Sequence, residues 1–109
     1  MNDQPRTPPF KLPDDCTDMR EVRAGVDGTD RELMDLLDRR FGYMRVAARI
    51  KPSRDAVRDE ARKAAVIEAA VQDARTRDLP ADKIADLWDL LVETSIAYEL
   101  VEWERLRRQ

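Results

Sequence analysis

Three cationic residues in the first half of the chain, Arg23, Arg40 and Lys51, could bind a small anion if they lie on one helix. Arg23 and Arg40 are 17 positions apart, which is about 25 Å along a helix and about 100° around it. Arg23 and Arg40 of one continuous helix therefore cannot both bind the same small anion. Arg40 and Lys51 are 11 positions apart and return to nearly the same face, so these two could serve one site while Arg23 serves another.

Two pairs in the second half, Arg58 with Arg62 and Ser95 with Glu99, have the i, i+4 spacing that places side chains on one helix face. Charged residues make up 39% of the chain, so such spacings also arise from surface ion pairs and solvated charges. The pattern by itself indicates an anion site and does not specify the ligand.

The composition excludes several kinds of chemistry. Histidine is absent, which removes the most frequent general base and metal ligand. The single cysteine, Cys16, cannot form an intrachain disulfide or a cysteine-rich zinc site, and we expect an inert, partly buried thiol. A net charge of −3, from 20 Lys+Arg and 23 Asp+Glu, argues against broad nucleic-acid binding. No run has the length of a membrane span, and the first residues lack a secretory apolar segment. We therefore expect a cytoplasmic protein without a metal, a cofactor, or a membrane or nucleic-acid partner.

The apolar periodicity predicts an all-α fold in which three helices follow an N-terminal arm. Residues 1–16 contain four of the six prolines and are expected to form an extended arm, whereas residues 17–109 form the helical domain. A first helix is predicted from Thr17 or Asp18 to the residue before Pro52. A second helix is predicted over 56–75, and a third from Pro80 nearly to the C-terminus, with both tryptophans in the core.

The length of the first predicted helix implies a second subunit. About 33 residues at 1.5 Å each give a helix of about 50 Å, which exceeds the diameter of a compact domain of this size. Two shorter helices of the same chain cannot cover it. The simplest partner is a second copy, and an antiparallel arrangement would bring Arg23 of one subunit to the site that contains Arg40 of the other.

These motifs resemble those of the all-helical chorismate mutase family over about residues 14–107, and in particular its isochorismate pyruvate lyase branch. That branch has a short Cys-Thr lead-in, present here as Asp15-Cys16-Thr17. The family's Arg, Arg and Lys of the first helix fall on Arg23, Arg40 and Lys51. Its second-helix motif, Val-Arg-Asp-x-x-Arg, falls on residues 57–62. Its third-helix Ser and Gln fall on Ser95 and Glu99.

The resemblance implies an intertwined homodimer of three-helix subunits, with two equivalent, cofactor-free sites for a small dicarboxylate. Arg23 would come from one subunit, and the other would contribute Arg40, Lys51, Asp59, Arg62, Ser95 and Glu99. The implied reaction is the concerted rearrangement of chorismate to prephenate, which needs no nucleophile or proton relay. Arg40 and the partner's Arg23 would hold the carboxylates and Arg62 would support them, as bidentate arginine contacts do. Lys51 would bridge a carboxylate and the breaking ether oxygen, and Asp59 would accept from the ring hydroxyl.

Two residues depart from the pattern of bacterial mutases. Glu99 stands where a Gln donates to the ether oxygen, and a carboxyl group can donate only when it is protonated. The structural alternative is a Lys51–Glu99 ion pair that closes the empty site. Lys63 stands where many bacterial mutases carry an acid. This difference and the Cys16-Thr17 lead-in favour the lyase branch, whereas Ser95 and the 57–62 motif favour the mutase.

We therefore predict a chorismate mutase in which Lys51, Glu99 and Arg40 act on the reacting substrate. The alternative within the family is an isochorismate pyruvate lyase, which forms salicylate and pyruvate, and an aminodeoxychorismate mutase is a third. A non-catalytic helical dimerisation module would explain the long first helix, but not the cations at family spacing. The arginine-rich end, residues 104–108, is interpreted as a complement to the helix dipole rather than as an RNA-binding segment.

Overall fold

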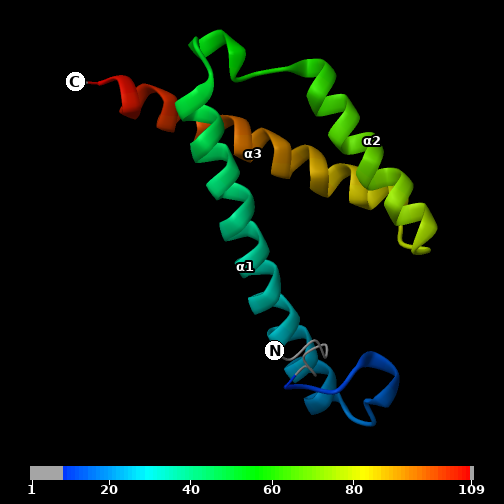
Figure 1. Ribbon diagram of the computed structural model, residues 1–109. Coiled ribbons are helices and arrows are strands. Elements are labelled where there is room, and N and C mark those ends of the chain that lie inside the picture. Colours follow the sequence, from blue (N-terminus) through cyan, green and yellow to red (C-terminus); the bar gives the residue numbers. More distant parts are fainter. Residues whose placement is uncertain (1–8, 109) are drawn as a thin grey trace, which may run out of the picture. The chain divides into compact units, whose positions relative to one another are not determined.

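The computed structural model describes residues 9–108, which are organised as three α-helices (Figure 1). These are α1 (Met19–Ile50), α2 (Glu60–Thr76) and α3 (Ala81–Arg107), with short 3-10 helices η1 (Pro13–Asp15) and η2 (Arg54–Ala56) before α1 and α2. No strand occurs within residues 9–108, so the predicted all-α class with a long first helix is confirmed. Among the helices of this part of the chain, none combines the length and apolar character of a membrane span.

The chain divides into two compact units, and the boundary between them falls within α1. The first unit ends at Arg40 and the second begins at Phe41. Within residues 9–40 only Gly28 is buried, so this part of the chain has no apolar core of its own. Large apolar side chains of α1 in this unit are exposed, namely Met19, Val22, Val26, Leu33, Met34 and Leu36.

The start of α1 is determined by a reciprocal set of capping hydrogen bonds. Oδ1 of Asp18 accepts from the backbone N–H of Glu21 at 2.8 Å, and Oε1 of Glu21 accepts from the backbone N–H and the hydroxyl of Thr17 at 2.9 and 2.8 Å. Lys11 forms an ion pair with Glu21. Together, Lys11 and Thr17 lower the pKa of the Glu21 carboxyl to about 2. The helix therefore begins where the sequence predicts, and it ends before Pro52 as expected.

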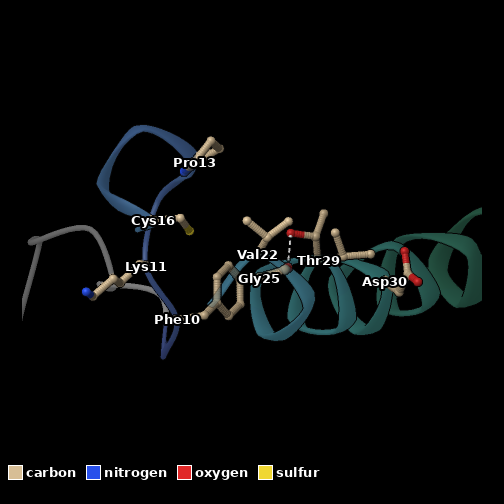
Figure 2. A pocket seen from close by; sticks show the side chains of 9 residues that line it. Phe10, Lys11, Pro13, Cys16, Val22, Gly25, Thr29 and Asp30 are labelled. Atoms are coloured by element: carbon tan, nitrogen blue, oxygen red, sulfur yellow. Dashed lines mark hydrogen bonds between the residues drawn. The ribbon is translucent and has the colours of Figure 1, made fainter. Parts of the chain in front are cut away.

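Residues 10–16 fold back onto the first turns of α1. The ring of Phe10 lies so close to Gly28 that a Cβ on this glycine would come within 2.1 Å of a ring carbon. A Cβ on Gly25 would meet its nearest neighbour, the carbonyl oxygen of Lys11, at 3.6 Å, which is an ordinary contact. Figure 2 shows the apolar pocket of about 350 Å³ that forms between the segment and the helix, with the partly buried Cys16 on its wall.

Replacing Gly28 by Ala is expected to displace the Phe10 ring and to expose the segment before α1. The same change at Gly25 should raise the melting temperature, because alanine favours a helix over glycine by about 1 kcal/mol and the Cβ fits there. Melting temperatures and the rate of proteolytic cleavage within residues 9–16 would be measured for both variants. Equal cleavage rates for Gly25→Ala and Gly28→Ala would contradict the Phe10 contact.

The second helix begins later than predicted. Asp59 has extended backbone angles (φ −130°, ψ 101°) and caps α2 through Oδ1, which accepts from the backbone N–H of Arg62 at 3.0 Å. Val57 is buried in the core, and Arg58 lies before the cap. The predicted helix over 56–75 is therefore confirmed from Glu60 onward, whereas its predicted start at Ala56, with Arg58 and Arg62 on one helix face, is wrong. The aspartate cap and the burial of Val57 outweigh the helical periodicity of this stretch.

α2 and α3 lie side by side and are joined by a tight turn (Figure 1). The N–H of Leu79 donates to the carbonyl of Ala74 at 2.8 Å, and the N–H of Asp78 donates to that of Arg75 at 3.2 Å. This is a Schellman motif, with Asp78 at φ 58° in the left-handed region. The core of the pair contains Val57, Val92 and Ile96, with Val66, Leu100 and Trp103 packed against them.

Candidate active site

Lys51, the first residue after α1, holds its ammonium group beside a buried carboxylate. Its Nζ lies 2.7 Å from Oε2 of Glu99 and donates to the carbonyl of Val57 at 3.3 Å. The side chain of Lys51 is 30% exposed, whereas that of Glu99 is 5% exposed. An anion could therefore reach the ammonium from solvent while the carboxylate stays enclosed.

Glu99 and Ser95 are the two buried polar side chains within residues 9–108, and they lie one turn apart on α3. The hydroxyl of Ser95 donates to the carbonyl of Leu91 at 2.7 Å. The contact of Glu99 with Lys51 is short, but no donor meets Oε2 of Glu99 at hydrogen-bond angles. The carboxyl group is thus held by the neighbouring charge more than by a directed hydrogen bond. An anionic ligand could therefore replace Glu99 as the partner of the Lys51 ammonium.

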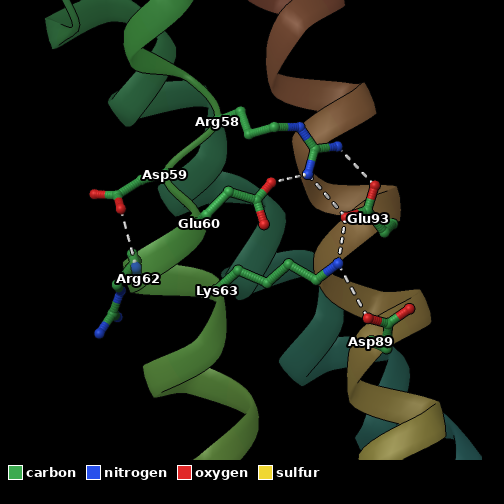
Figure 3. A network of polar contacts seen from close by, with 7 residues as sticks. All are labelled: Arg58, Asp59, Glu60, Arg62, Lys63, Asp89 and Glu93. Carbon is green, nitrogen blue, oxygen red and sulfur yellow. Dashed lines mark hydrogen bonds and ion pairs between the residues drawn. The ribbon is translucent and has the colours of Figure 1, made fainter.

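Asp59 and Arg62 are positioned by the first turn of α2. The carboxylate of Asp59 caps the helix at the backbone N–H of Arg62, and both residues are exposed. Figure 3 shows that both side chains point away from α3. These two predicted site residues are therefore brought together by the cap and remain accessible to a ligand.

Arg58 and Lys63 form an ion-pair network with α3 that was not predicted from the sequence (Figure 3). Arg58 donates to both carboxylate oxygens of Glu93, at 3.0 and 2.7 Å. Lys63 donates to Glu93 at 2.7 Å and lies 3.0 Å from a carboxylate oxygen of Asp89. Arg58 and Lys63 lower the pKa of Glu93 to about 2, so this carboxylate is charged at neutral pH. The signal available in the sequence was the i, i+4 spacing of Asp89 and Glu93, which places two acids on one helix face where they can pair with cations of a neighbouring helix.

The other two predicted cations lie in the unit that ends at Arg40. Arg23 is exposed on α1, next to Val22 of the apolar pocket, and Arg40 is partly buried. Lys51 and Glu99 both belong to the second unit. The structure thus brings Lys51, Ser95 and Glu99 into one neighbourhood, and the roles of Arg23 and Arg40 stay predictions.

The chemistry available at this site is that of oriented charges. Within residues 9–108, no three side chains of His, Cys, Asp or Glu gather where they could hold a metal ion. The partly exposed ammonium of Lys51 can bind an anion, and Glu99 can accept a hydrogen bond or, when protonated, donate one.

Comparisons with known proteins place this arrangement in a family. Residues 22–100 match the family described as chorismate mutase type II, and this range contains all seven predicted site residues. The chain is also 29% identical over 98 residues to an isochorismate pyruvate lyase of Pseudomonas aeruginosa, an alignment that covers 90% of this chain and 97% of that protein. The family match spans most of the chain and takes in parts of all three helices. The chain therefore belongs to the chorismate mutase type II family.

Proposed function

We propose that this protein is a chorismate mutase, which rearranges chorismate to prephenate in a cationic pocket shared by two subunits. The observation that carries the proposal is the Lys51–Glu99 pair, in which a partly exposed ammonium lies against a buried carboxyl group in a chain of this family. A buried carboxyl group costs folding free energy, and apolar residues would pack two helices as well. Its presence beside the accessible Lys51 therefore supports a site that binds and acts on an anion.

The rearrangement breaks one C–O bond and forms one C–C bond in a single cyclic transition state. The site must select a compact conformer of the substrate and stabilise the negative charge that develops on the ether oxygen. Lys51 would bridge a substrate carboxylate and this oxygen. Glu99, when protonated, would donate to the same oxygen, and Ser95 would line the pocket one turn away.

Arginines would bind the two carboxylates of the substrate. Arg40 and Arg23 of the partner subunit would make the principal contacts, and Arg62 would support the substrate from the start of α2. The planar guanidinium group matches a carboxylate with two parallel hydrogen bonds. Asp59 would accept a hydrogen bond from the ring hydroxyl while it caps α2.

The partner in this proposal is a second copy of the chain. The apolar face of α1 within residues 9–40 is open to solvent, with Val26 54% and Leu33 50% exposed. Contiguous apolar surface of this kind marks an interaction site, and burying the exposed half of each such side chain is worth about 1 kcal/mol. An antiparallel second copy would cover this face and would bring its own Arg23 to the site.

The alternative function is isochorismate pyruvate lyase activity, which eliminates pyruvate from isochorismate and leaves salicylate. It is favoured by the similarity to the Pseudomonas aeruginosa protein of that name. It is also favoured by Lys63, whose ammonium is held by Glu93 and Asp89 on α3. This position therefore offers no carboxylate to a ring hydroxyl. Both reactions are concerted and would use the same pocket.

Incubation of the purified protein with chorismate and, separately, with isochorismate tests the proposal. Prephenate from chorismate is the expected product, whereas salicylate and pyruvate from isochorismate would favour the lyase. Lys51→Met protein prepared in the same way controls for contaminating enzymes. No turnover of either substrate by a folded dimer would overturn the proposal in favour of a dimerisation module.

Glu99 gives the proposed mutase a testable pH dependence. Activity is expected to be higher at low pH than at high pH, because only a protonated carboxyl group of Glu99 can donate to the ether oxygen. Glu99→Gln should flatten the profile of kcat/KM against pH, because an amide donates at every pH. Glu104→Gln, an exposed acid of the same helix that pairs with Arg54, should leave the wild-type slope. A pH-independent wild-type rate together with an inactive Glu99→Gln variant would contradict this role.

A further inference from the structure

The C-terminal end of α1 is held by an arginine from the far end of α3. The last carbonyl groups of a helix have no partner within that helix, and those of α1 turn to Arg107. Its Nη1 donates to the carbonyl of Ala48 at 2.9 Å, and its Nη2 donates to that of Lys51 at 2.8 Å. Nη2 also donates to the carbonyl of Arg49 at 3.4 Å. One guanidinium group thus satisfies three peptide oxygens, those of residues 48, 49 and 51, at the negative end of the helix dipole.

A tryptophan on the same face of α3 completes this contact. Nε1 of Trp103 donates to the carbonyl of Lys51 at 3.0 Å, so this oxygen receives two donors. The guanidinium carbon of Arg107 lies 4.2 Å from the centroid of the Trp103 ring, which adds a cation–π contact between the two donors. The peptide group of Lys51 is therefore fixed from two sides.

The side chain and the main chain of Lys51 are held by one stripe of α3. Glu99, Trp103 and Arg107 are spaced at i, i+4 and i+8 along α3. Glu99 contacts the ammonium group of Lys51, whereas Trp103 and Arg107 both donate to its backbone carbonyl. Of the two ends of Lys51, only the ammonium can change partners when an anion binds. The main-chain end would stay anchored and would determine how far the ammonium can move.

We propose that Trp103 and Arg107 are positioning residues for Lys51 in the reaction. The inference rests on the proposed function, because it assumes that the Lys51 ammonium contacts the substrate. Neither residue belongs to the predicted anion site, and neither would touch the substrate. They hold the peptide group of Lys51 so that its ammonium is in place before the substrate arrives, and a displacement of about 1 Å in such a group can cost about 100-fold in rate.

Replacement of Arg107 by Ala in the 109-residue chain tests the proposal. We expect kcat/KM to fall about 10- to 100-fold, with most of the loss in kcat, because the ammonium is then misplaced in the transition state. Amide hydrogen exchange at residues 49–53 should become faster. Arg107→Lys should recover only part of the activity, because a lysine cannot span the three carbonyls. Arg105→Ala is the matched control, since Arg105 pairs with Glu102 within α3, and it should retain wild-type kcat/KM.

A double variant separates positioning from a merely structural role. In a Lys51→Met background, Arg107→Ala should cause no further loss of activity, because the residue acts only through Lys51. A further loss of the same size as in the wild-type background would overturn the proposal, as would an Arg107→Ala variant with wild-type kcat/KM. If Arg107→Ala does not fold, Trp103→Phe decides, because it keeps an aromatic ring at this position and removes the N–H donor. It should lower kcat by several-fold, and an unchanged kcat would overturn the proposal. Wild-type protein inactive on chorismate and on isochorismate would instead overturn the proposed function, and the positioning role with it.

Discussion

Mixed dimers of two inactive variants, Arg23→Ala and Arg40→Ala, are expected to recover about a quarter of the wild-type activity. Each variant alone removes an arginine from both sites of its dimer. In a mixed dimer, one site combines both substitutions, and the other combines an intact Arg23 with an intact Arg40 of the other subunit. Random exchange makes half of the dimers mixed, so about one site in four is intact. The measurement is the rate of chorismate turnover after the two proteins are unfolded and refolded together.

The matched control combines two residues that the proposal assigns to the same subunit. Mixed dimers of Arg40→Ala and Lys51→Met contain no intact site, and they should stay inactive. Recovery in this second mixture, or its absence in the first when mixed dimers are demonstrated, would contradict a site shared in this way. The outcome also tests the second copy as the partner of α1, because two separate monomeric sites could not complement each other.

Lys51→Met is expected to lower kcat/KM about 100- to 1000-fold, the loss that follows removal of one donor to a developing oxyanion. The loss should appear mainly in kcat, because the contact with the ether oxygen strengthens in the transition state. Lys63→Met is the matched control, since Lys63 also pairs with acids of α3, and it should change kcat/KM little. Comparable losses in both variants would show that ion pairing to α3, and not the position of Lys51, explains the effect.

The same variant separates the structural and the catalytic roles of the Lys51–Glu99 pair. Lys51→Met leaves the carboxylate of Glu99 buried without its cation. This should cost about 2 kcal/mol in the free energy of unfolding, less than for a fully buried pair because Lys51 is 30% exposed. Adding Glu99→Gln removes the buried charge and should restore most of the stability but none of the activity. A double variant that regains activity would show that Lys51 serves only to close the site. Urea unfolding and initial rates measure the two quantities.

The helices of this protein follow from local signals that can be read along the chain. The cap at Asp18 and the proline at position 52 bound α1 in the structure as the sequence predicts. The start of α2 was predicted four residues too early, because periodicity continues through Val57 and Arg58. Local competition between a helical turn and the Asp59 cap is resolved only when Val57 enters the core.

The candidate site is only partly a property of the sequence. The residue types and spacings of Lys51, Ser95 and Glu99 identify an anion site once the family resemblance is added. That Lys51 lies 2.7 Å from Glu99 depends on how the end of α1 is placed against α3, and no spacing along one helix reports this distance. Arg107 shows the same limit: it complements the end of its own helix, as the sequence predicts, by donating to the carbonyl of Trp103, but the sequence does not reveal that it also caps α1.

The sequence by itself thus determined which segments are helical and where most of them begin and end. These properties depend on capping and periodicity within a few residues of chain. The Lys51–Glu99 pair that the sequence analysis names is present in the structure, whereas the tertiary structure alone decided where Arg58 and Lys63 direct their charges and which residues hold the end of α1. Those pairings join residues about 30 to 60 positions apart, and they arise from the packing of helix faces that local propensity does not specify.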